Sequence, residues 1–386
     1  MNIIAVCNTP LQLICALNLK RNRYINDTFD IIISDHMPNS RFIAESSNKF
    51  KIFDSALYAE TFMLCRGKEQ FFSDGMKGKY QRLFCREKLL NKIIDIHKKY
   101  DVMLFNNFDL FNRLLYQVLY KKNKALKAYI IEDGYSSYFA QGWEWEKAYR
   151  KSLGVKSQVK KAVFGEIELA ANLNGQFVYS PELVQWKAPF ERLAIPKISL
   201  SDKAFLTQLN QLFGYDKMED RYDTPIIFFE ESFRKEGYDI GDIELVEAIA
   251  DIVGTENIMI KRHPRNDDNT FEQKGYKVNK NTVIPWEVII MNNPDLQKKI
   301  LVTICSGAAA TPYTMFNMSI NSVILLKLMK NREKINYEFY DIYFNYMDSA
   351  VFKKYPNVFY EPRTMKELRD YFMKWKEENV EKQSYK

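Results

Sequence analysis

Residues 2–20 read NIIAVCNTPLQLICALNLK, and this stretch decides the fold class of the chain. Its first part, residues 2–7, is short and almost wholly apolar, which predicts a buried strand. Asn8 and Thr9 then mark a tight turn, and Pro10 suits the start of a helix that the pattern extends over residues 11–20. A buried strand that turns directly into a helix is the first half of a β-α-β unit, so we expect a parallel sheet.

The same alternation of short apolar runs with longer amphipathic stretches continues along the chain. Further strands are expected at residues 29–34, 51–57, 102–105, 129–131, 226–229, 258–261, 301–304 and 323–326. Further helices are expected at residues 69–99, 110–120, 243–253 and 365–381. Residues 135–174 follow no regular pattern. This rhythm predicts a parallel sheet in each half of the chain, covered by helices on both faces.

The length of the chain sets the expected number of domains. It has 386 residues, against roughly 100–200 residues per domain, so we expect two. We place a Rossmann-like domain over residues 1–175 and a second over residues 176–386, facing one another across a central cleft. The last helix is free in this scheme to pack back on the first domain.

Composition excludes several classes of protein. Hydrophobic residues make up 46% of the chain and charged residues 27%, which excludes a disordered or collagenous protein. The 56 lysines and arginines exceed the 49 aspartates and glutamates, which gives a net charge of +7. This bias is too weak for a nucleic-acid-binding protein, but it suits an anionic substrate or contact with an acidic membrane face.

Cysteine usage and hydropathy indicate a compartment. The five cysteines, at positions 7, 15, 65, 85 and 305, form no CxxC pair, so we expect reduced thiols in a cytoplasmic protein. No basic segment precedes the first apolar run, and no run of about 18 apolar residues occurs, so neither a signal peptide nor a spanning helix is expected. Contact with the inner face of the cell membrane would then be peripheral.

A basic segment directly follows the strand expected at residues 258–261. Lys261, Arg262, His263, Pro264 and Arg265 lie where ligands bind in open α/β sheets, beyond the carboxyl end of a strand. The cations supply charge for a phosphate, and the imidazole can donate a hydrogen bond or a proton to a leaving oxyanion. The alternative is a solvated basic turn.

A run of small residues follows the strand expected at residues 301–304. Ser306 is placed to cap the next helix, and Gly307 and Ala308 allow a ligand to approach the backbone closely. Free N–H groups at a helix N-terminus bind anions, so this is a second candidate phosphate site. The alternative is a capped, tightly packed helix.

Two polar segments follow strands of the first half. Glu132 and Asp133 precede Gly134, which permits a sharp turn; we expect one acid to face the cleft, as a general base, and the other to support the loop. Asn8 and Thr9 follow the first strand and either bind a ligand or cap the next helix. An ordinary acidic turn and a simple cap are the alternatives.

Several well-known motifs are absent from the sequence. It contains no GxGxxG, Walker A, GxSxG or HExxH motif. Only three histidines occur, so no histidine-rich metal site is expected. There is also no Asp-x-Asp motif of the kind that holds a metal-bound nucleotide diphosphate. A sugar-transferring enzyme with this sequence would stabilise its leaving phosphate with side chains and backbone dipoles.

The ordered set of motifs resembles bacterial sialyltransferases, most closely glycosyltransferase family 52, the lipooligosaccharide and capsule sialyltransferases. The resemblance extends from residue 2 to about residue 330. The motifs that carry it are CNTPLQL at residues 7–13, Glu132-Asp133-Gly134, His263-Pro264, Pro285-Trp286-Glu287 and Ser306-Gly307.

The resemblance implies a GT-B-like fold, CMP-N-acetylneuraminic acid as donor, inversion at the anomeric carbon and no requirement for a metal or other cofactor. The acceptor it implies is a galactose-terminated surface glycan. His263 then resembles the phosphate-binding general acid, Ser306 a phosphate ligand and Glu287 the group that holds the ribose hydroxyls.

Carried over from related sialyltransferases, the acceptor-activating base is Glu132 or Asp133. Within family 52 the base is alternatively an acid just upstream of the His-Pro strand, for which Asp239 and Asp242 are the candidates. The wider substrate-binding set comprises Asn8, Thr9, Lys261, Pro264, Arg265, Glu287, Ser306, Gly307 and Ala308.

Two other functions fit the same residues. The fold could transfer another sugar, such as glucose, from a nucleotide diphosphate, or the chain could be a non-catalytic nucleotide- or glycan-binding protein of capsule assembly. The partners expected are a nucleotide sugar and a glycan, with no nucleic acid, and the resemblance is compatible with a homodimer.

Overall fold

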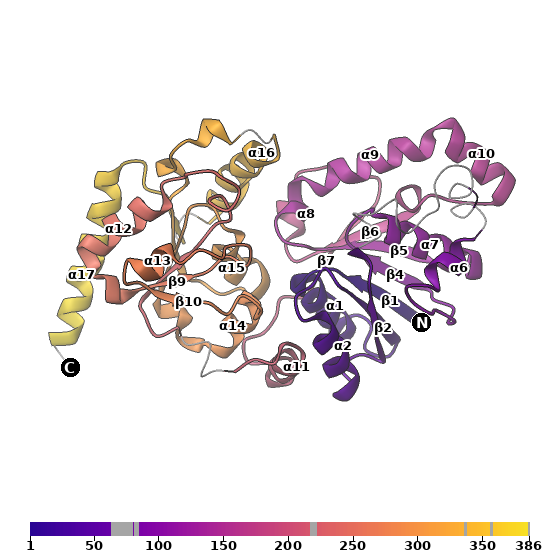
Figure 1. Cartoon of the computed structure of the whole chain (residues 1–386), viewed down its shortest axis with the longest axis horizontal. Coiled ribbons are helices and arrows are strands. Elements are labelled where there is room, and N and C mark those ends of the chain that lie inside the picture. The colour runs from indigo at the N-terminus through magenta and orange to yellow at the C-terminus, as the bar shows by residue number, and fades with distance from the viewer. Residues whose placement is uncertain (63–79, 81–84, 217–221, 336–337, 356–357, 385–386) are drawn as a thin grey trace. The chain divides into compact units, whose positions relative to one another are not determined.

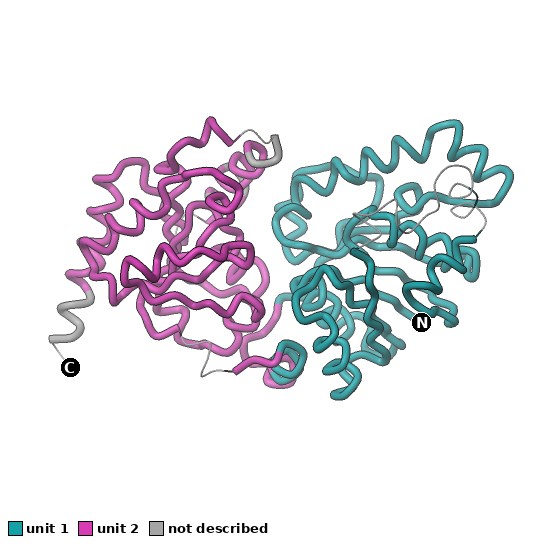
Figure 2. Tube along the Cα trace, viewed as in Figure 1, with its two compact units in different colours: residues 1–197, 207–213 teal, residues 198–206, 214–386 magenta. Residues whose placement is uncertain are grey.

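The computed structural model describes residues 1–62, 80, 85–216, 222–335, 338–355 and 358–384. The chain forms two compact units (Figure 2). Unit 1 comprises residues 1–197 with 207–213, and unit 2 comprises residues 198–206 with 214–386. Each unit contains one parallel sheet, so the expected α/β class is confirmed.

The sheet of unit 1 has seven strands in the order β3-β2-β1-β4-β5-β6-β7 (Figure 1). Its first strand, β1, lies inside the sheet, and successive strands are added on one side of it up to β3 and on the other side from β4. The direction of strand order therefore reverses between β1 and β4. Such a reversal is the ligand-binding position of an open α/β sheet. The strands are β1 (Asn2–Cys7), β2 (Thr28–Ser34), β3 (Ser55–Ala59), β4 (Val102–Phe105), β5 (Lys127–Ile131), β6 (Leu173–Val178) and β7 (Glu191–Ala194).

The sheet of unit 2 repeats this plan with six strands in the order β10-β9-β8-β11-β12-β13. Here the order reverses between β8 and β11. The strands are β8 (Ile226–Phe229), β9 (Ile258–Lys261), β10 (Lys277–Asn279), β11 (Ile300–Thr303), β12 (Asn321–Ile324) and β13 (Phe359–Tyr360).

Helix boundaries follow local capping chemistry. The Thr9 hydroxyl accepts the Gln12 N–H at the start of α1, Asp109 caps α7, and α12 ends at Gly254 with a φ of 92° that favours glycine. The α-helices of unit 1 are α1 (Pro10–Asn22), α2 (Ser40–Lys49), α6 (Arg86–Leu90), α7 (Leu110–Lys122), α8 (Ser136–Phe139), α9 (Gln141–Leu153) and α10 (Val155–Phe164), and α11 (Lys203–Phe213) is shared between the units. Those of unit 2 are α12 (Asp242–Val253), α13 (Thr270–Gln273), α14 (Trp286–Asn292), α15 (Thr311–Phe316), α16 (Glu338–Tyr346) and α17 (Met365–Ser384).

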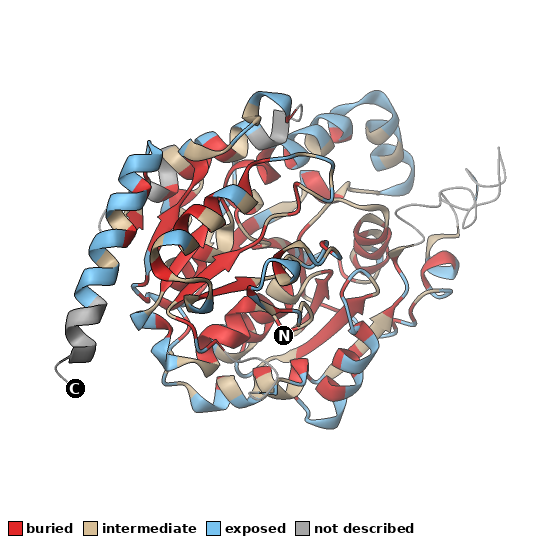
Figure 3. Cartoon of the chain, turned by 60° about the vertical axis from the view of Figure 1, so that its left-hand side comes forward, coloured by how far each residue is buried: buried red, intermediate tan, exposed pale blue. Residues whose placement is uncertain are grey.

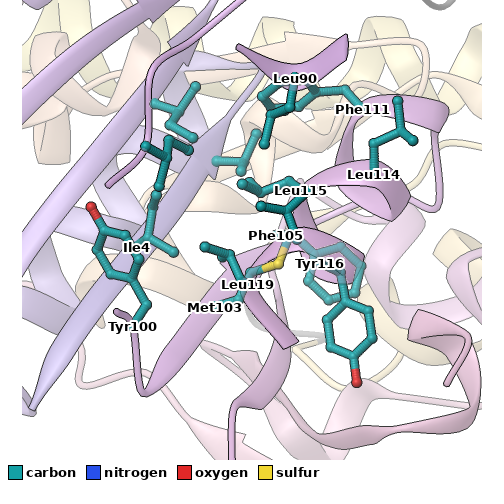
Figure 4. Close-up of a cluster of buried hydrophobic side chains, with 14 of the residues drawn as sticks. Ile4, Leu90, Tyr100, Met103, Phe105, Phe111, Leu114, Leu115, Tyr116 and Leu119 are labelled. Atoms are coloured by element: carbon teal, nitrogen blue, oxygen red, sulfur yellow. The ribbon is translucent and has the colours of Figure 1, made fainter. Parts of the chain in front are cut away.

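The strands of both sheets are largely buried, and the apolar side chains that they bury form the cores of the two units (Figure 3). In unit 1, Ile4 of β1 and Met103 and Phe105 of β4 pack with Leu115 and Leu119 of α7 in one apolar cluster (Figure 4). This cluster fixes the two strands that flank the reversal of the first sheet. No helix in the described ranges is both long and apolar enough to cross a membrane.

The structure differs from the sequence-based boundaries in three places. A boundary at residue 175 would cut through β6, because β6 and β7 extend the first sheet and unit 1 continues to Lys197. Residues 135–174 include three helices, α8 to α10, rather than irregular chain. The last helix, α17, packs against α12 of its own unit.

The helix expected at residues 69–99 is not continuous. Its described part contains only α6, followed by turns and irregular chain, and residues 69–79 and 81–84 lie outside the described residues. Cysteine 65 also lies outside them. The other cysteines are free thiols, and Cys7, Cys15 and Cys305 are buried.

Candidate active site

The loops that carry His263 and Ser306 lie at one edge of the second sheet. Phe229, the last residue of β8, is in register with Lys261 of β9 on one side and with Thr303 of β11 on the other. Two strand spacings, about 10 Å in all, therefore separate Lys261 from Thr303. Both loops leave the carboxyl ends of strands at the position where open α/β sheets bind ligands.

The His263 imidazole is held as a hydrogen-bond donor. Its Nδ1 accepts the Arg265 N–H at 3.1 Å, so the proton of the neutral ring is on Nε2. Burial, and then the positive charges of Arg265 and Lys261, lower the pKa of His263 to about 4, although Glu236 opposes this shift. The ring is therefore neutral at pH 7 and offers an Nε2–H group. Arg265 is exposed and pairs with Glu236 at 2.9 Å.

The Ser306 loop is a short turn rather than the start of a long helix. Gly307–Ala309 forms a single 3-10 turn, and Ser306 Oγ accepts the Ala308 N–H at 3.3 Å. The Ser306 N–H donates to Thr303 Oγ1 at 3.0 Å. The expected cap is confirmed, but it closes a 3-10 turn, so the dipole of a long helix is not available at this point.

Two acids that the sequence analysis overlooked hold both loops. Glu230 and Glu231 directly follow β8, between the two loops. Glu230 Oε2 accepts the His263 N–H at 3.1 Å, and Glu231 Oε1 accepts the Cys305 N–H at 3.2 Å and the Thr303 hydroxyl at 3.0 Å. Their position after an expected strand was the available signal.

The environments of these acids differ. Burial raises the pKa of Glu231 to about 7, while its hydrogen bonds from Cys305 and Thr303 lower it in part. Glu230 is buried and paired with Arg234, which also binds Asp242 at 2.6 Å. Glu231 therefore accepts hydrogen bonds from neutral groups, whereas Glu230 forms an ion pair with Arg234.

The two alternative bases upstream of the His-Pro strand differ in exposure. Asp242 is buried in the first turn of α12 and bound to Arg234, and burial raises its pKa to about 6 despite that pairing. Asp239 is exposed in a turn, where its Oδ1 accepts the Gly241 N–H at 3.0 Å.

The Pro-Trp-Glu segment joins the same edge of the second sheet. Trp286 donates from its indole Nε1 to the Ala308 carbonyl at 3.0 Å, which ties the start of α14 to the Ser306 loop. Glu287 is buried; burial raises its pKa, and the positive charge of Lys261 opposes the shift. Four sequence-predicted groups, Lys261, His263, Glu287 and Ser306, thus lie around one sheet edge.

The two acids of unit 1, Glu132 and Asp133, differ in burial and in their hydrogen-bond partners. Glu132 is buried, and its Oε2 accepts the Tyr138 hydroxyl and the Tyr179 N–H, each at 2.6 Å. Burial raises its pKa to about 7. Asp133 is only half-buried, and Thr9 donates its hydroxyl to Asp133 Oδ1 at 2.6 Å.

Asn8 forms a backbone hydrogen bond at the start of α1. Its N–H donates to Gln12 Oε1 at 2.7 Å, and the residue is buried, so it completes the cap of α1. Gly134 turns the chain with a φ of 68°, as expected for this turn. Asp133 is the less buried acid of its pair, although burial raises the pKa of its carboxyl and hydrogen bonds from Thr9 and Gln12 oppose this shift.

A cavity of about 410 Å³ lies in unit 1 beside the end of β4. Its lining includes Asn107, Phe108 and Arg113, together with Glu144 and Lys147 of α9. Burial raises the pKa of Glu144, and the negative charge of Asp133 raises it further, so this wall is near Asp133. The cavity holds both charges and an aromatic ring, a lining suited to a sugar.

Metal-ligating side chains do not gather in the described part of the chain. Among those residues, no group of three or more His, Cys, Asp or Glu side chains is placed to hold a metal ion.

Comparison with known proteins identifies the family. A family model described as alpha-2,8-polysialyltransferase (POLYST) matches residues 3–323. The chain belongs to this family. It is a sialyltransferase family, so that part of the sequence-based resemblance is confirmed, while the narrower family 52 stays a prediction. A search of curated proteins finds no significant match.

Similar solved structures were found at low sequence identity. The spinosyn forosaminyltransferase SpnP has a TM-score of 0.50 and 10% identity, over 96% of this chain and 88% of its own. Arabidopsis thaliana UGT89C1, solved with UDP-L-rhamnose, has a TM-score of 0.48 and 8% identity, over 96% and 89%. The fold of this polysialyltransferase-family chain is that of the GT-B glycosyltransferases.

Proposed function

We propose that this glycosyltransferase moves N-acetylneuraminic acid from CMP-sialic acid to a hydroxyl group of a surface glycan, with inversion and without a metal ion. The observation that carries the proposal is the shared sheet edge of His263 and Ser306 in a chain of a sialyltransferase family. Both residues suit a leaving phosphate monoester, which carries less charge than a nucleotide diphosphate.

The donor side of the proposal rests on hydrogen-bond donors at that edge. His263 would donate from Nε2 and Ser306 from its hydroxyl to the CMP phosphate, and Lys261 would supply positive charge. The neutral ring stabilises the leaving oxygen by donating this hydrogen bond. The negative charge of a bound phosphate also raises the pKa of the imidazole, so a ring that takes up a second proton from solvent can pass that proton to the leaving oxygen and return to the neutral form. Glu287 is the candidate partner of the ribose hydroxyls.

The acceptor side of the proposal rests on Asp133. As the bond from the anomeric carbon to the phosphate oxygen breaks, the acceptor oxygen forms its bond to that carbon and its proton passes to the Asp133 carboxylate. One such displacement inverts the anomeric centre. Asp133 suits this role better than Glu132, because Glu132 is buried and tied to the backbone N–H of Tyr179, whereas Asp133 is only half-buried.

Two acceptors fit the proposal. A galactose-terminated glycan is the one implied by the sequence resemblance. A sialic-acid-terminated glycan is the one described by the name of the matched family. Both present a hydroxyl nucleophile, and the cavity near Asp133 is the candidate place for the acceptor sugar.

The test is transfer by the purified chain from CMP-sialic acid, in EDTA, to a galactoside and to an α2,8-linked sialic acid oligomer. We expect CMP release and a product one sialic acid longer. No transfer to either acceptor, together with stabilisation against heat by UDP or GDP but not by CMP, would instead support another nucleotide sugar. Tight CMP binding without any turnover would support a non-catalytic binding protein.

A further inference from the structure

The surface of α10 carries an exposed apolar stripe. Val155, Val159 and Val163 repeat every four residues, so they lie along one face of this helix. Their exposed fractions are 79%, 51% and 65%, and α10 contains no buried residue. In Figure 1 the helix lies at the rim of unit 1, beyond the end of α9. Water-exposed valines at this spacing are unfavourable unless something covers them.

The helix α17 shows what a covered amphipathic helix looks like in the same chain. It packs against α12, and its Leu368 and Phe372 are fully buried. Its exposed positions mix acidic and basic residues, such as Lys366, Glu367 and Asp370. The apolar side of α17 is therefore buried against a neighbouring helix, whereas the three valines of α10 are exposed.

The charged residues of α10 itself are all lysines, and the nearest acids in the sequence are Glu146 and Glu166. Residues 147–164 read KAYRKSLGVKSQVKKAVF and contain no aspartate or glutamate. The basic residues of this segment are Lys147, Arg150, Lys151, Lys156, Lys160 and Lys161. Three of these residues lie on α10, and three lie in the last turns of α9, where Arg150 pairs with Glu146. A group of basic residues on and beside an amphipathic helix is the pattern that attracts anionic lipid surfaces. A soluble polyanion would bind the lysines but would leave the valines exposed to water, whereas a lipid surface would cover both.

We propose that α10 is a membrane-surface helix, which inserts Val155, Val159 and Val163 into the acyl boundary of an anionic bilayer while its lysines contact the lipid headgroups. Apolar burial and charge attraction then act together, as in other helices that lie in the plane of the interface. The proposal does not depend on the donor or the acceptor of the transfer reaction, because vesicle binding is measured without either.

The test is co-sedimentation of the full chain with vesicles of phosphatidylcholine, alone or with roughly one-third phosphatidylglycerol. We expect binding to the anionic vesicles only. Combined replacement Lys156→Gln, Lys160→Gln and Lys161→Gln should weaken it on the order of 100-fold. Combined replacement Val155→Ser, Val159→Ser and Val163→Ser should weaken it on the order of tenfold or more while leaving the charge unchanged.

Matched variants elsewhere in the chain serve as controls. Ile25→Ser with Phe42→Ser removes exposed apolar groups of the same unit, and Lys366→Gln with Lys374→Gln removes exposed charges of α17. Both should bind like the parent chain.

Three results would overturn the proposal. The first is that the parent chain does not bind the anionic vesicles. The second is that the lysine variant loses binding and the serine variant does not, which would make α10 a polyanion-binding surface. The third is that the parent chain dimerises in light scattering while the serine variant does not, which would make the stripe a contact between copies.

Discussion

Two strands of this protein end in a pair of acids, and the pairs behave differently. In unit 1, β5 is followed by Glu132 and Asp133, and in unit 2, β8 is followed by Glu230 and Glu231. Glu132 is bound to the scaffold, but Asp133 contacts a hydroxyl group and remains half-buried. Both acids of unit 2 accept backbone N–H groups of neighbouring loops, as Glu132 does.

The difference shows that the same sequence pattern can support either chemistry or positioning. Glu132, Glu230 and Glu231 each accept a backbone N–H, which ties the carboxylate to the fold, whereas the hydrogen bonds to Asp133 come from the side chains of Thr9 and Gln12. Glu230 and Glu231 are therefore positioning residues, which hold the loops of His263 and Ser306. Asp133 is the acid of the four that we propose as the general base.

The largest expected effect separates the two acids of unit 1. Asp133→Asn preserves the oxygen that accepts the Thr9 hydroxyl but removes the proton acceptor, so it should lower the transfer rate on the order of 10³-fold. Glu132→Gln, the matched change, should leave the rate within about tenfold of the parent at pH 7, since this buried acid accepts its hydrogen bonds from Tyr138 and Tyr179. Initial rates of CMP release measure both.

A circular dichroism spectrum of each variant controls for folding. If Glu132→Gln abolished transfer in a folded protein and Asp133→Asn did not, the assignment within the pair would be reversed. If neither variant lost activity, the base would lie upstream of the His-Pro strand, where Asp239→Asn is the next variant to measure.

The next effect concerns the loop held by Glu230. His263→Ala should lower the transfer rate on the order of 10²-fold or more, because it removes the Nε2–H donor from the leaving phosphate. His97→Ala is the control, since His97 is exposed and bonded to Asp95. Near-normal turnover of the His263 variant would remove this residue from the mechanism.

Much of the fold follows from local sequence, and the exceptions have local causes. The strands at residues 2–7 and 226–229 are short apolar runs bounded by polar residues, so their expected ends coincide with the observed ones. The strand β6 was missed because Gly175 and Gln176 interrupt its apolar pattern. Position 175 needs glycine, because a side chain there would crowd the Tyr129 ring. Gln176 can be buried because its amide donates hydrogen bonds to the Ser137 carbonyl and to Gln141 Oε1.

The position of the site could be predicted from the sequence, but the hydrogen bonds that hold its loops could not. His263 and Ser306 follow strands, so their place at the sheet edge could be expected from the sequence. The support given by Glu230 and Glu231 depends on which strand lies between the two loops. That order follows from the pairing of β8 with both β9 and β11, which no single stretch of the sequence encodes.

The pH dependence of stability tests the buried acid of unit 1. Burial raises the pKa of Glu132 to about 7, so the folded protein holds a proton that the unfolded chain releases above its ordinary pKa. The stabilisation is fully present below pH about 4.5 and is lost as the pH rises through about 7. It amounts to up to about 3 kcal/mol for a shift of this size.

Glutamine at this position does not titrate, so Glu132→Gln should remove that part of the pH dependence. The measurement is the difference in Tm between pH 5 and pH 8 in parent and variant, which cancels the other titrating groups. An equal difference in the two proteins would show that Glu132 is charged at pH 5.

The smallest expected effect compares the two hydroxyl caps. Thr9 and Ser306 each accept a backbone N–H at 3.3 Å, one at the start of α1 and the other at the 3-10 turn after β11. As caps alone, Thr9→Ala and Ser306→Ala should each cost about 1 kcal/mol of stability. If Ser306 also binds the phosphate, its variant should in addition bind CMP about tenfold more weakly in calorimetry, the loss of one hydrogen bond to a charged group. The Thr9 variant should bind CMP like the parent, because its hydroxyl contacts Asp133 on the proposed acceptor side. Equal CMP affinity in all three proteins would leave Ser306 as a structural cap and remove it from the donor site.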